Sequence, residues 1–317
     1  RRATALMRTF VLSGGGNRGP LEVGALLALL ARGIQPEMIV GSSAGALNGA
    51  MLAIEPTVEQ THRMQQLWVR AGQRKLISAS PGRSLWQLIR GASYISDNKA
   101  LKRWVLRRAL PMGRQTFGEL AVKLYVTIAH LRTHTMYVYG DDPAAGVAEA
   151  VVTSAAVPGF FPPAIRKGEV FVDGGAVSNL PVRLAVSRGA TEIYAVDLAF
   201  SHDHPRSFDR LLNIVDAAVK PVLYGEALRE LEAVVQRPGI IVHHIPIYDF
   251  PDVALSDFSR VNEMVAAGER VMAAYLDNPA PNQIRYPRAW QAADLPEGPP
   301  GSRPFIPPAS LLENNQG

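Results

Sequence analysis

EMIVGSSAGALNGAMLA occupies residues 37–53, and its two halves differ in hydrophobic pattern. Residues 37–40 resemble a short buried strand, whereas residues 44–53 form a helical pattern built from small side chains. Between them, Gly41-Ser42-Ser43-Ala44-Gly45 matches Gly-x-Ser-x-Gly, with only Ser43 at the central position. A strand, sharp turn and helix of this kind are typical of a nucleophile elbow, in which the glycines let strand and helix approach closely.

The same pentapeptide also fits a loop that merely packs a helix on a sheet, so its surroundings must decide. If Ser43 is a nucleophile, its hydroxyl lies at a helix N-terminus. There the amide of Ala44 and the helix dipole can stabilise a developing oxyanion.

A glycine-rich loop precedes the elbow, between a strand pattern at residues 8–13 and an apolar helical pattern at residues 20–31. Its glycines allow consecutive amides to point into one concavity, as an oxyanion hole requires. The loop consists of Gly14, Gly15, Gly16, Asn17, Arg18 and Gly19. It also fits the dinucleotide fingerprint, but the next strand ends in serine and glycine where that fingerprint needs an acidic residue. A phosphate-binding P-loop is weaker still, because no Gly-Lys-Ser/Thr follows.

Asp173 follows a strand pattern at residues 169–172 and precedes two glycines. Alone, Asp-Gly predicts a turn. A serine nucleophile needs a proton acceptor, however, and Asp173 comes at a strand end, where active-site groups collect in open α/β sheets. A Ser-His-Asp arrangement stays open as the alternative mechanism, with its histidine drawn from His202, His204, His243 and His244. The His202-Asp203-His204 cluster is poor support for a metal site.

The rest of the chain alternates strand and helix patterns, which predicts an α/β fold with a mostly parallel central sheet flanked by helices. Further strands are expected at residues 123–129, 135–139, 192–196 and 240–245, and further helices at 144–152, 182–187, 208–235 and 258–276. We expect a catalytic domain over residues 1–276, a basic helical cap at 57–114 within it, and a proline-rich tail at 277–317.

Positive charge is concentrated in the cap. Residues 62–114 hold twelve Lys/Arg against one acid, a net +11, so the remaining chain is −6 within a total of +5. Trp68, Trp86 and Trp104 lie in the same segment. Tryptophan suits the interface between lipid head groups and acyl chains, so this segment could contact anionic membrane. Tryptophans packed under a solvated charged face are the alternative, and no nucleic-acid-binding motif is present.

Composition limits the chemistry and the compartment. The 317 residues include no cysteine, which excludes disulfides and thiolate catalysis and fits a reducing compartment. No apolar run reaches the roughly 18 residues that span a bilayer, and residues 1–10 lack the apolar core of a signal peptide. We therefore expect a soluble, cytoplasmic chain, with peripheral membrane contact through the cap.

Four motifs together resemble the patatin-like phospholipase family. They are GGGNRG at residues 14–19, GSSAG at 41–45, TSAAVPGFFPP at 153–163 and DGG at 173–175, in that order and spacing. The resemblance implies a three-layer patatin-like fold over about residues 8–198, with Ser43 as nucleophile and Asp173 as its only side-chain base. It places the oxyanion hole at residues 14–19, with Arg18 where the family carries a basic residue. Pro20 departs from the family's usual small or aromatic residue.

By the same resemblance, the chain is a lipid acyl hydrolase that cleaves phospholipids or lysophospholipids and needs no metal or organic cofactor. Two alternatives use the same motifs. One is an acyltransferase, which passes the acyl group to an alcohol instead of water. The other is an inactive lipid-binding protein, which the intact dyad and glycine loop disfavour.

Overall fold

The computed structural model describes residues 6–73, 99–110, 116–158, 160–198, 211–250, 253 and 257–286, with only the backbone at residues 100 and 211–222. The described residues as far as Arg285 belong to one compact unit. Trp86 in the predicted cap, His202 and His204, and most of the predicted tail lie outside the described residues.

The described strands form one eight-stranded sheet in the order β5-β6-β3-β2-β1-β7-β8, with β4 paired to β3. Their bounds are β1 Arg8–Leu12, β2 Met38–Gly41, β3 Lys123–His130, β4 Thr135–Tyr139, β5 Ala164–Arg166, β6 Glu169–Asp173, β7 Glu192–Asp197 and β8 Ile241–Pro246. The five strands from β3 to β8 in this order run parallel, whereas β4, β5 and β6 are antiparallel to their neighbours. The predicted mostly parallel sheet is therefore confirmed.

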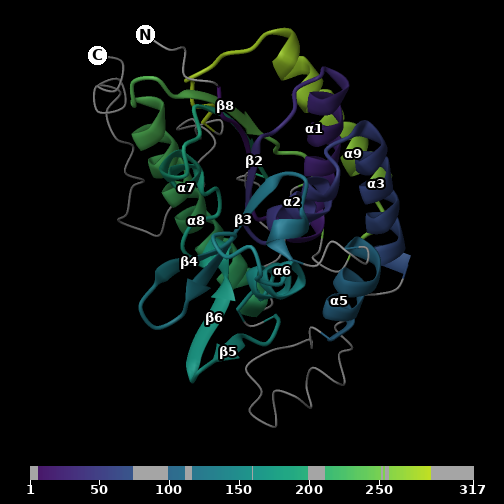
Figure 1. The fold of residues 1–317 in the computed structure, drawn as a ribbon, viewed down its shortest axis with the longest axis vertical. Coiled ribbons are helices and arrows are strands. Elements are labelled where there is room, and N and C mark those ends of the chain that lie inside the picture. The colour runs from purple at the N-terminus through teal and green to yellow at the C-terminus, as the bar shows by residue number, and fades with distance from the viewer. Residues whose placement is uncertain are drawn as a thin grey trace, which may run out of the picture. The chain divides into compact units, whose positions relative to one another are not determined.

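Helices cover both faces of this sheet, which gives the three layers visible in Figure 1. One apolar core joins Phe10, Ile39 and Val126 to α1, α2, α3, α6 and α9, and the other joins Val11 and Val40 to α7 and α8. The helix bounds are α1 Gly19–Ala31, α2 Ala44–Ile54, α3 Val58–Gln73, α5 Lys99–Trp104, α6 Val147–Ser154, α7 Val182–Ser187, α8 Leu211–Val235 and α9 Val261–Asp277. Strands buried on both faces account for the continuous apolar runs of β1 and β2.

Two strand ends meet along one edge of β3. Residues 126–130 of β3 pair with β4, whereas residues 123–126 pair with β2 and residues 128–130 pair with β6. Because β4 occupies one edge, β2 and β6 share the other. β2 runs parallel and β6 antiparallel to β3, so their C-terminal ends approach each other head-on. This arrangement brings the residues after Gly41 and those at Asp173 to the same place.

The described part of the predicted cap comprises α3, α5 and a π-helical turn, Val105–Ala109. Trp68 and Trp104 are each only 5% exposed and belong to the main apolar core. The interpretation of these two tryptophans as membrane-interface residues is therefore wrong: they attach the segment to the domain. Lys102, Arg103, Arg107 and Arg108 are exposed on the other side.

No helix in the described ranges has both the length and the apolar composition needed to cross a bilayer. After α9, the chain returns to the sheet, where the Val242 N–H of β8 donates to the Asn282 side chain over 2.7 Å.

Candidate active site

Ser43 lies at the turn between β2 and α2 in a backbone conformation that L-residues rarely adopt, with φ 52° and ψ −117°. The flanking glycines make this turn possible. A Cβ on Gly41 would collide with the backbone of Gly45, and one on Gly45 would collide with the Leu12 carbonyl. A strained non-glycine residue costs of order 1–3 kcal/mol and is characteristic of functional sites. The turn has the form that the Gly-x-Ser-x-Gly pattern predicts.

The strained turn is held by a residue that the sequence did not single out. The Ser43 N–H donates to the hydroxyl oxygen of Ser154 over 2.8 Å, and Ser154 is fully buried at the end of α6. Two residues later, the Ala156 carbonyl accepts the N–H of Asp173 over 3.0 Å. The α6 end therefore fixes both strand termini. The only signal for Ser154 is its place in the stretch at residues 153–163.

Asp173 ends β6 and is only 5% exposed. Its Oδ1 accepts the Gly175 N–H over 2.8 Å. Burial raises the pKa of Asp173 to about 6, and the nearby Ser43 hydroxyl and the Gly175 N–H partly offset that rise. Its Oδ2 is buried without a hydrogen-bond partner among the described atoms. The Ser43 hydroxyl is thus close enough to affect the carboxyl, although no well-formed hydrogen bond joins them, and such bonds often tighten only when substrate binds.

Asn179 connects the Asp173 turn to the glycine loop, a role that the sequence did not indicate. Its side-chain amide donates to the Gly14 carbonyl over 3.1 Å, and its backbone carbonyl accepts the Gly14 N–H over 3.1 Å. A Cβ on Gly14 would collide with the Asn179 side chain and come within 3.2 Å of the Ser43 Cβ. The loop therefore lies directly against the elbow.

The amides around Ser43 divide into occupied and available groups. The Arg18 N–H donates to the Gly15 carbonyl over 3.1 Å, and the Gly19 N–H donates to the Gly16 carbonyl. Together with Gly14, these N–H groups are used inside the fold. In the part of the chain that the structure describes, the N–H groups of Gly15, Gly16 and Ala44 donate to no backbone acceptor. These N–H groups, two in the glycine loop and one directly after Ser43, are therefore available to a ligand.

Arg18 points away from this concavity toward the ends of β7 and β8. Its guanidinium donates to the carbonyls of Leu198, Ile247 and Asp249 over 3.4, 2.8 and 3.1 Å. Burial lowers its pKa to about 10. Asn17 is held similarly, because its side-chain amide donates to the Asp257 carbonyl over 2.8 Å. Both side chains anchor the glycine loop.

A buried polar network fixes the loop relative to α2. The Asn48 side-chain amide donates to the Gly19 carbonyl over 2.9 Å and to Glu22 over 2.8 Å. The Trp68 indole N–H donates to the Asn48 side-chain oxygen over 2.9 Å. Burial raises the pKa of Glu22 well above its usual value. Three helices are thus joined behind the site, and the sequence did not single out Asn48 or Glu22.

The described candidates for a triad histidine lie elsewhere. His243 and His244 belong to β8, which is three strands away from β2 in the sheet. A His243 ring nitrogen contacts the Tyr275 hydroxyl over 2.9 Å, and a His244 nitrogen contacts Asp197 over 3.3 Å. Neither ring contacts Ser43 or Asp173. Within the described ranges, no cluster of three His, Asp or Glu side chains is arranged to hold a metal.

The sequence of this chain is similar to those of one known protein family. The sequence model of the family described as "Patatin-like phospholipase" matches residues 10–186. The chain is 25% identical to lysophospholipase NTE1 of Mycosarcoma maydis over 284 residues, covering 83% of this chain and 14% of that protein. It is 28% identical to mouse patatin-like phospholipase domain-containing protein 7 over 204 residues, covering 62% of this chain and 14% of that protein. It thus spans about a seventh of the length of these relatives.

Among solved structures, the chain is similar to VipD from Legionella pneumophila, with a TM-score of 0.46 and 18% identity over 86% of this chain and 67% of that one. It is also similar to the ExoU-SpcU complex of Pseudomonas aeruginosa, with a TM-score of 0.43 and 16% identity over 87% of this chain and 52% of that one.

Proposed function

The chain belongs to the patatin-like phospholipase family, and we propose that it hydrolyses carboxylic esters of phospholipids or lysophospholipids through a Ser43-Asp173 dyad. The observation that carries the proposal is the strained Ser43 turn at a helix N-terminus, beside a buried carboxyl that has an unpartnered oxygen. The names of the NTE1 relatives support lysophospholipids as substrates.

In the first step, the Ser43 oxygen attacks the ester carbonyl carbon while the Asp173 carboxylate accepts the hydroxyl proton. The negative charge moves to the carbonyl oxygen, where the N–H groups of Gly15, Gly16 and Ala44 are available as donors. The tetrahedral intermediate then collapses with cleavage of the ester C–O bond. Asp173 returns the proton to the departing alcohol, which leaves an acyl group on Ser43.

In the second step, water attacks the acyl-enzyme and gives its proton to Asp173. The oxyanion forms in the same place, and its collapse breaks the bond to Ser43, which recovers the proton. The fatty acid leaves. Each proton taken up by Asp173 is thus returned, and the dyad needs no further base.

A lipid panel tests the substrate class. The purified chain is incubated with a phospholipid, a lysophospholipid and a neutral glyceride, and released fatty acid is measured with and without an added alcohol. Release from the two phospholipid classes is expected. Transfer to the alcohol in preference to water would assign an acyltransferase, and turnover of none would support the inactive lipid-binding alternative.

Peripheral contact with anionic membrane through the cap belongs to the same proposal. Lys102, Arg103, Arg107 and Arg108 are exposed on α5 and the following π-helical turn, and Leu106 among them is 38% exposed. Each cation near an anionic surface contributes about 1 kcal/mol, so four together can hold the protein there. Because Trp68 and Trp104 are buried, this contact depends on charge and on Leu106.

A further inference from the structure

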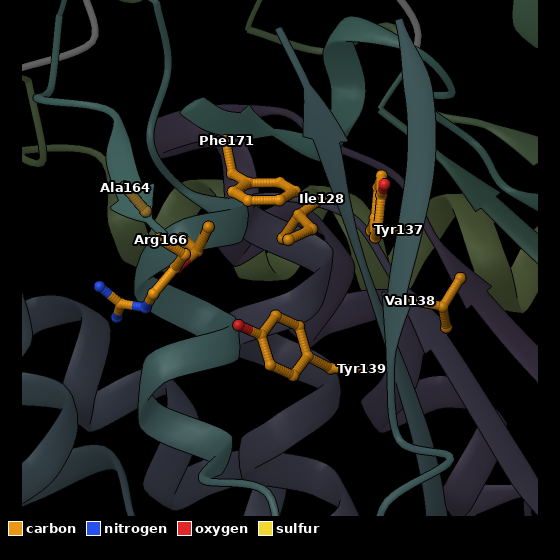
Figure 2. Close-up of a pocket in the computed structure, with 8 residues that line it drawn as sticks. Ile128, Tyr137, Val138, Tyr139, Ala164, Arg166 and Phe171 are labelled. Carbon is orange, nitrogen blue, oxygen red and sulfur yellow. The ribbon is translucent and has the colours of Figure 1, made fainter. Parts of the chain in front are cut away.

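A cavity of about 270 Å³ opens between the antiparallel strands and α6. It is lined by Ile128, Tyr137, Val138, Tyr139, Thr153, Ala164, Arg166 and Phe171. Figure 2 shows the rings of Tyr139 and Phe171 around Ile128, with the Arg166 guanidinium at the edge. Resting on the proposed ester hydrolysis, we propose that this cavity binds the fatty acyl chain of the substrate.

Strand register places the cavity beside the dyad. Ile128 lies directly opposite Asp173 in the β3-β6 ladder, and directly opposed side chains lie about 5 Å apart on one face of a sheet. Phe171 precedes Asp173 by two residues, so its side chain is on the same face. On the opposite wall, Thr153 immediately precedes Ser154, which binds the Ser43 N–H. The cavity lining therefore includes the cross-strand neighbour of Asp173 and the residue that precedes Ser154.

The lining suits hydrocarbon better than a charged head group. Ile128, Ala164 and Phe171 present aliphatic or aromatic surface, whereas the Val138 side chain packs on the other face of the sheet. The one charged lining residue, Arg166, already pairs with Glu149 at 2.6 Å. Burial raises the pKa of Tyr139, and the interaction of its hydroxyl with Glu149 raises it further. A phosphate would have to displace Glu149, whereas an acyl chain leaves the pair intact.

The cavity's size fits part of a lipid. Sites for drug-sized ligands measure about 300–1,000 Å³, and this cavity lies just below that range at about 270 Å³. It is too small for a whole phospholipid. When the ester carbonyl is at Ser43, the part of the acyl chain nearest to that carbonyl reaches the cavity.

Ala164→Phe tests the inference by filling the cavity. Ala164 pairs with Phe171 and faces the cavity, whereas Ile165 is on the other face of β5 and is 62% exposed. Ile165→Phe is therefore the matched control. The assay uses p-nitrophenyl acetate, butyrate, octanoate and decanoate, which vary the acyl chain at a constant leaving group. Far-UV circular dichroism and the unfolding midpoint check that both variants are folded.

We expect Ala164→Phe to lower kcat/KM for decanoate about tenfold or more, since pocket contacts discriminate on this scale, and to change the acetate rate less than about twofold. Ile165→Phe should match the parent. An equal loss for acetate and decanoate, or no loss, overturns the cavity assignment while the parent's acetate hydrolysis still supports the proposed function.

A binding experiment separates the two proposals further. A fluorescent fatty acid is titrated against the Ser43→Ala protein, so that the measurement does not depend on turnover. Introducing Ala164→Phe into this protein should weaken binding of the fatty acid at least about tenfold, whereas introducing Ile165→Phe should not. Equal binding to all three proteins contradicts the inference whether or not the parent hydrolyses esters.

Discussion

The backbone N–H of Ser43 donates a hydrogen bond to the side-chain oxygen of Ser154, 111 residues further along the chain, over 2.8 Å. This bond satisfies a buried donor at the strained turn before α2. It also connects Ser43 to α6, whose C-terminal extension holds the N–H of Asp173. We therefore infer that Ser154 positions the proposed dyad.

Ser154→Ala should lower kcat with little change in KM. A buried N–H left without a partner costs about 1–3 kcal/mol, so the turn relaxes and the rate falls roughly 5- to 150-fold. Ser154→Thr keeps the hydroxyl and should restore part of the rate. Ser187→Ala, which removes an exposed hydroxyl from α7, is the control. A loss confined to unfolding temperature, with kcat unchanged, would show that Ser154 is only structural.

Asp173→Asn should lower ester hydrolysis at least about 10²-fold, the typical contribution of a general base. Alanine at His243 or His244 should cost much less, because both lie on β8 and have other partners. The same is expected at His202 and His204. One histidine variant as inactive as Asp173→Asn would establish a triad in place of the dyad.

The pH dependence of kcat/KM should follow the ionisation of Asp173. Burial raises the pKa of this carboxyl to about 6, and only the carboxylate accepts a proton. The rate should therefore rise about tenfold per pH unit below 6 and level off above it. A profile that is flat between pH 5 and 7 would exclude Asp173 as the base.

The raised pKa of Asp173 also makes the free energy of unfolding depend on pH. The folded-state pKa of Asp173 exceeds its usual value of 3.8, so its contribution to stability is lost as pH rises from about 4 through 6. Asp173→Asn removes this cost and should raise the free energy of unfolding at pH 8 by up to about 3 kcal/mol. Urea unfolding at pH 4 and pH 8 measures the difference.

Changing Lys102, Arg103, Arg107 and Arg108 to Gln should weaken binding to anionic vesicles more than tenfold at low salt, since each charge contributes about 1 kcal/mol. High salt should weaken the parent as well. Four exposed cations elsewhere, Arg132, Lys167, Arg229 and Arg237, changed to Gln provide the control. Equal sedimentation with neutral and anionic vesicles would remove electrostatic docking and leave the catalytic assignment untouched.

Much of the fold was predictable because local patterns agree with the final structure. The strand at residues 135–139 and the helix at 182–187 have the predicted bounds. The strand before Asp173 is one residue longer than predicted, and the strand before the elbow is shifted by one residue at both ends. Pro20 did not disturb α1, which begins at Gly19 with the proline in its first turn, where no N–H is needed. β5 was not predicted, because three residues carry too little periodicity.

Long-range relationships were not predictable in this way. Nothing in residues 169–173 shows that β6 runs antiparallel, yet this direction is what brings Asp173 to the end of β2. Ser154, Asn179 and Asn48 are ordinary residues in sequence, and only the folded chain brings them against Ser43, Gly14 and Gly19. The burial of Trp68 and Trp104 likewise depends on tertiary packing that overrides their basic surroundings.

Covalent labelling of the nucleophile tests the central claim most directly. The parent, Ser43→Ala and Ser42→Ala proteins are treated with a fluorophosphonate, the labelled peptide is mapped, and hydrolysis of a lysophospholipid is measured in parallel. Ser42 is fully buried, with its hydroxyl lacking a hydrogen-bond partner among the described atoms. The Ser42→Ala variant therefore tests whether the reactive serine is Ser43 or its neighbour. We predict labelling at Ser43 in the parent and in Ser42→Ala, with neither labelling nor hydrolysis in folded Ser43→Ala. Labelling at Ser42, or near-normal turnover by pure Ser43→Ala, would contradict the account.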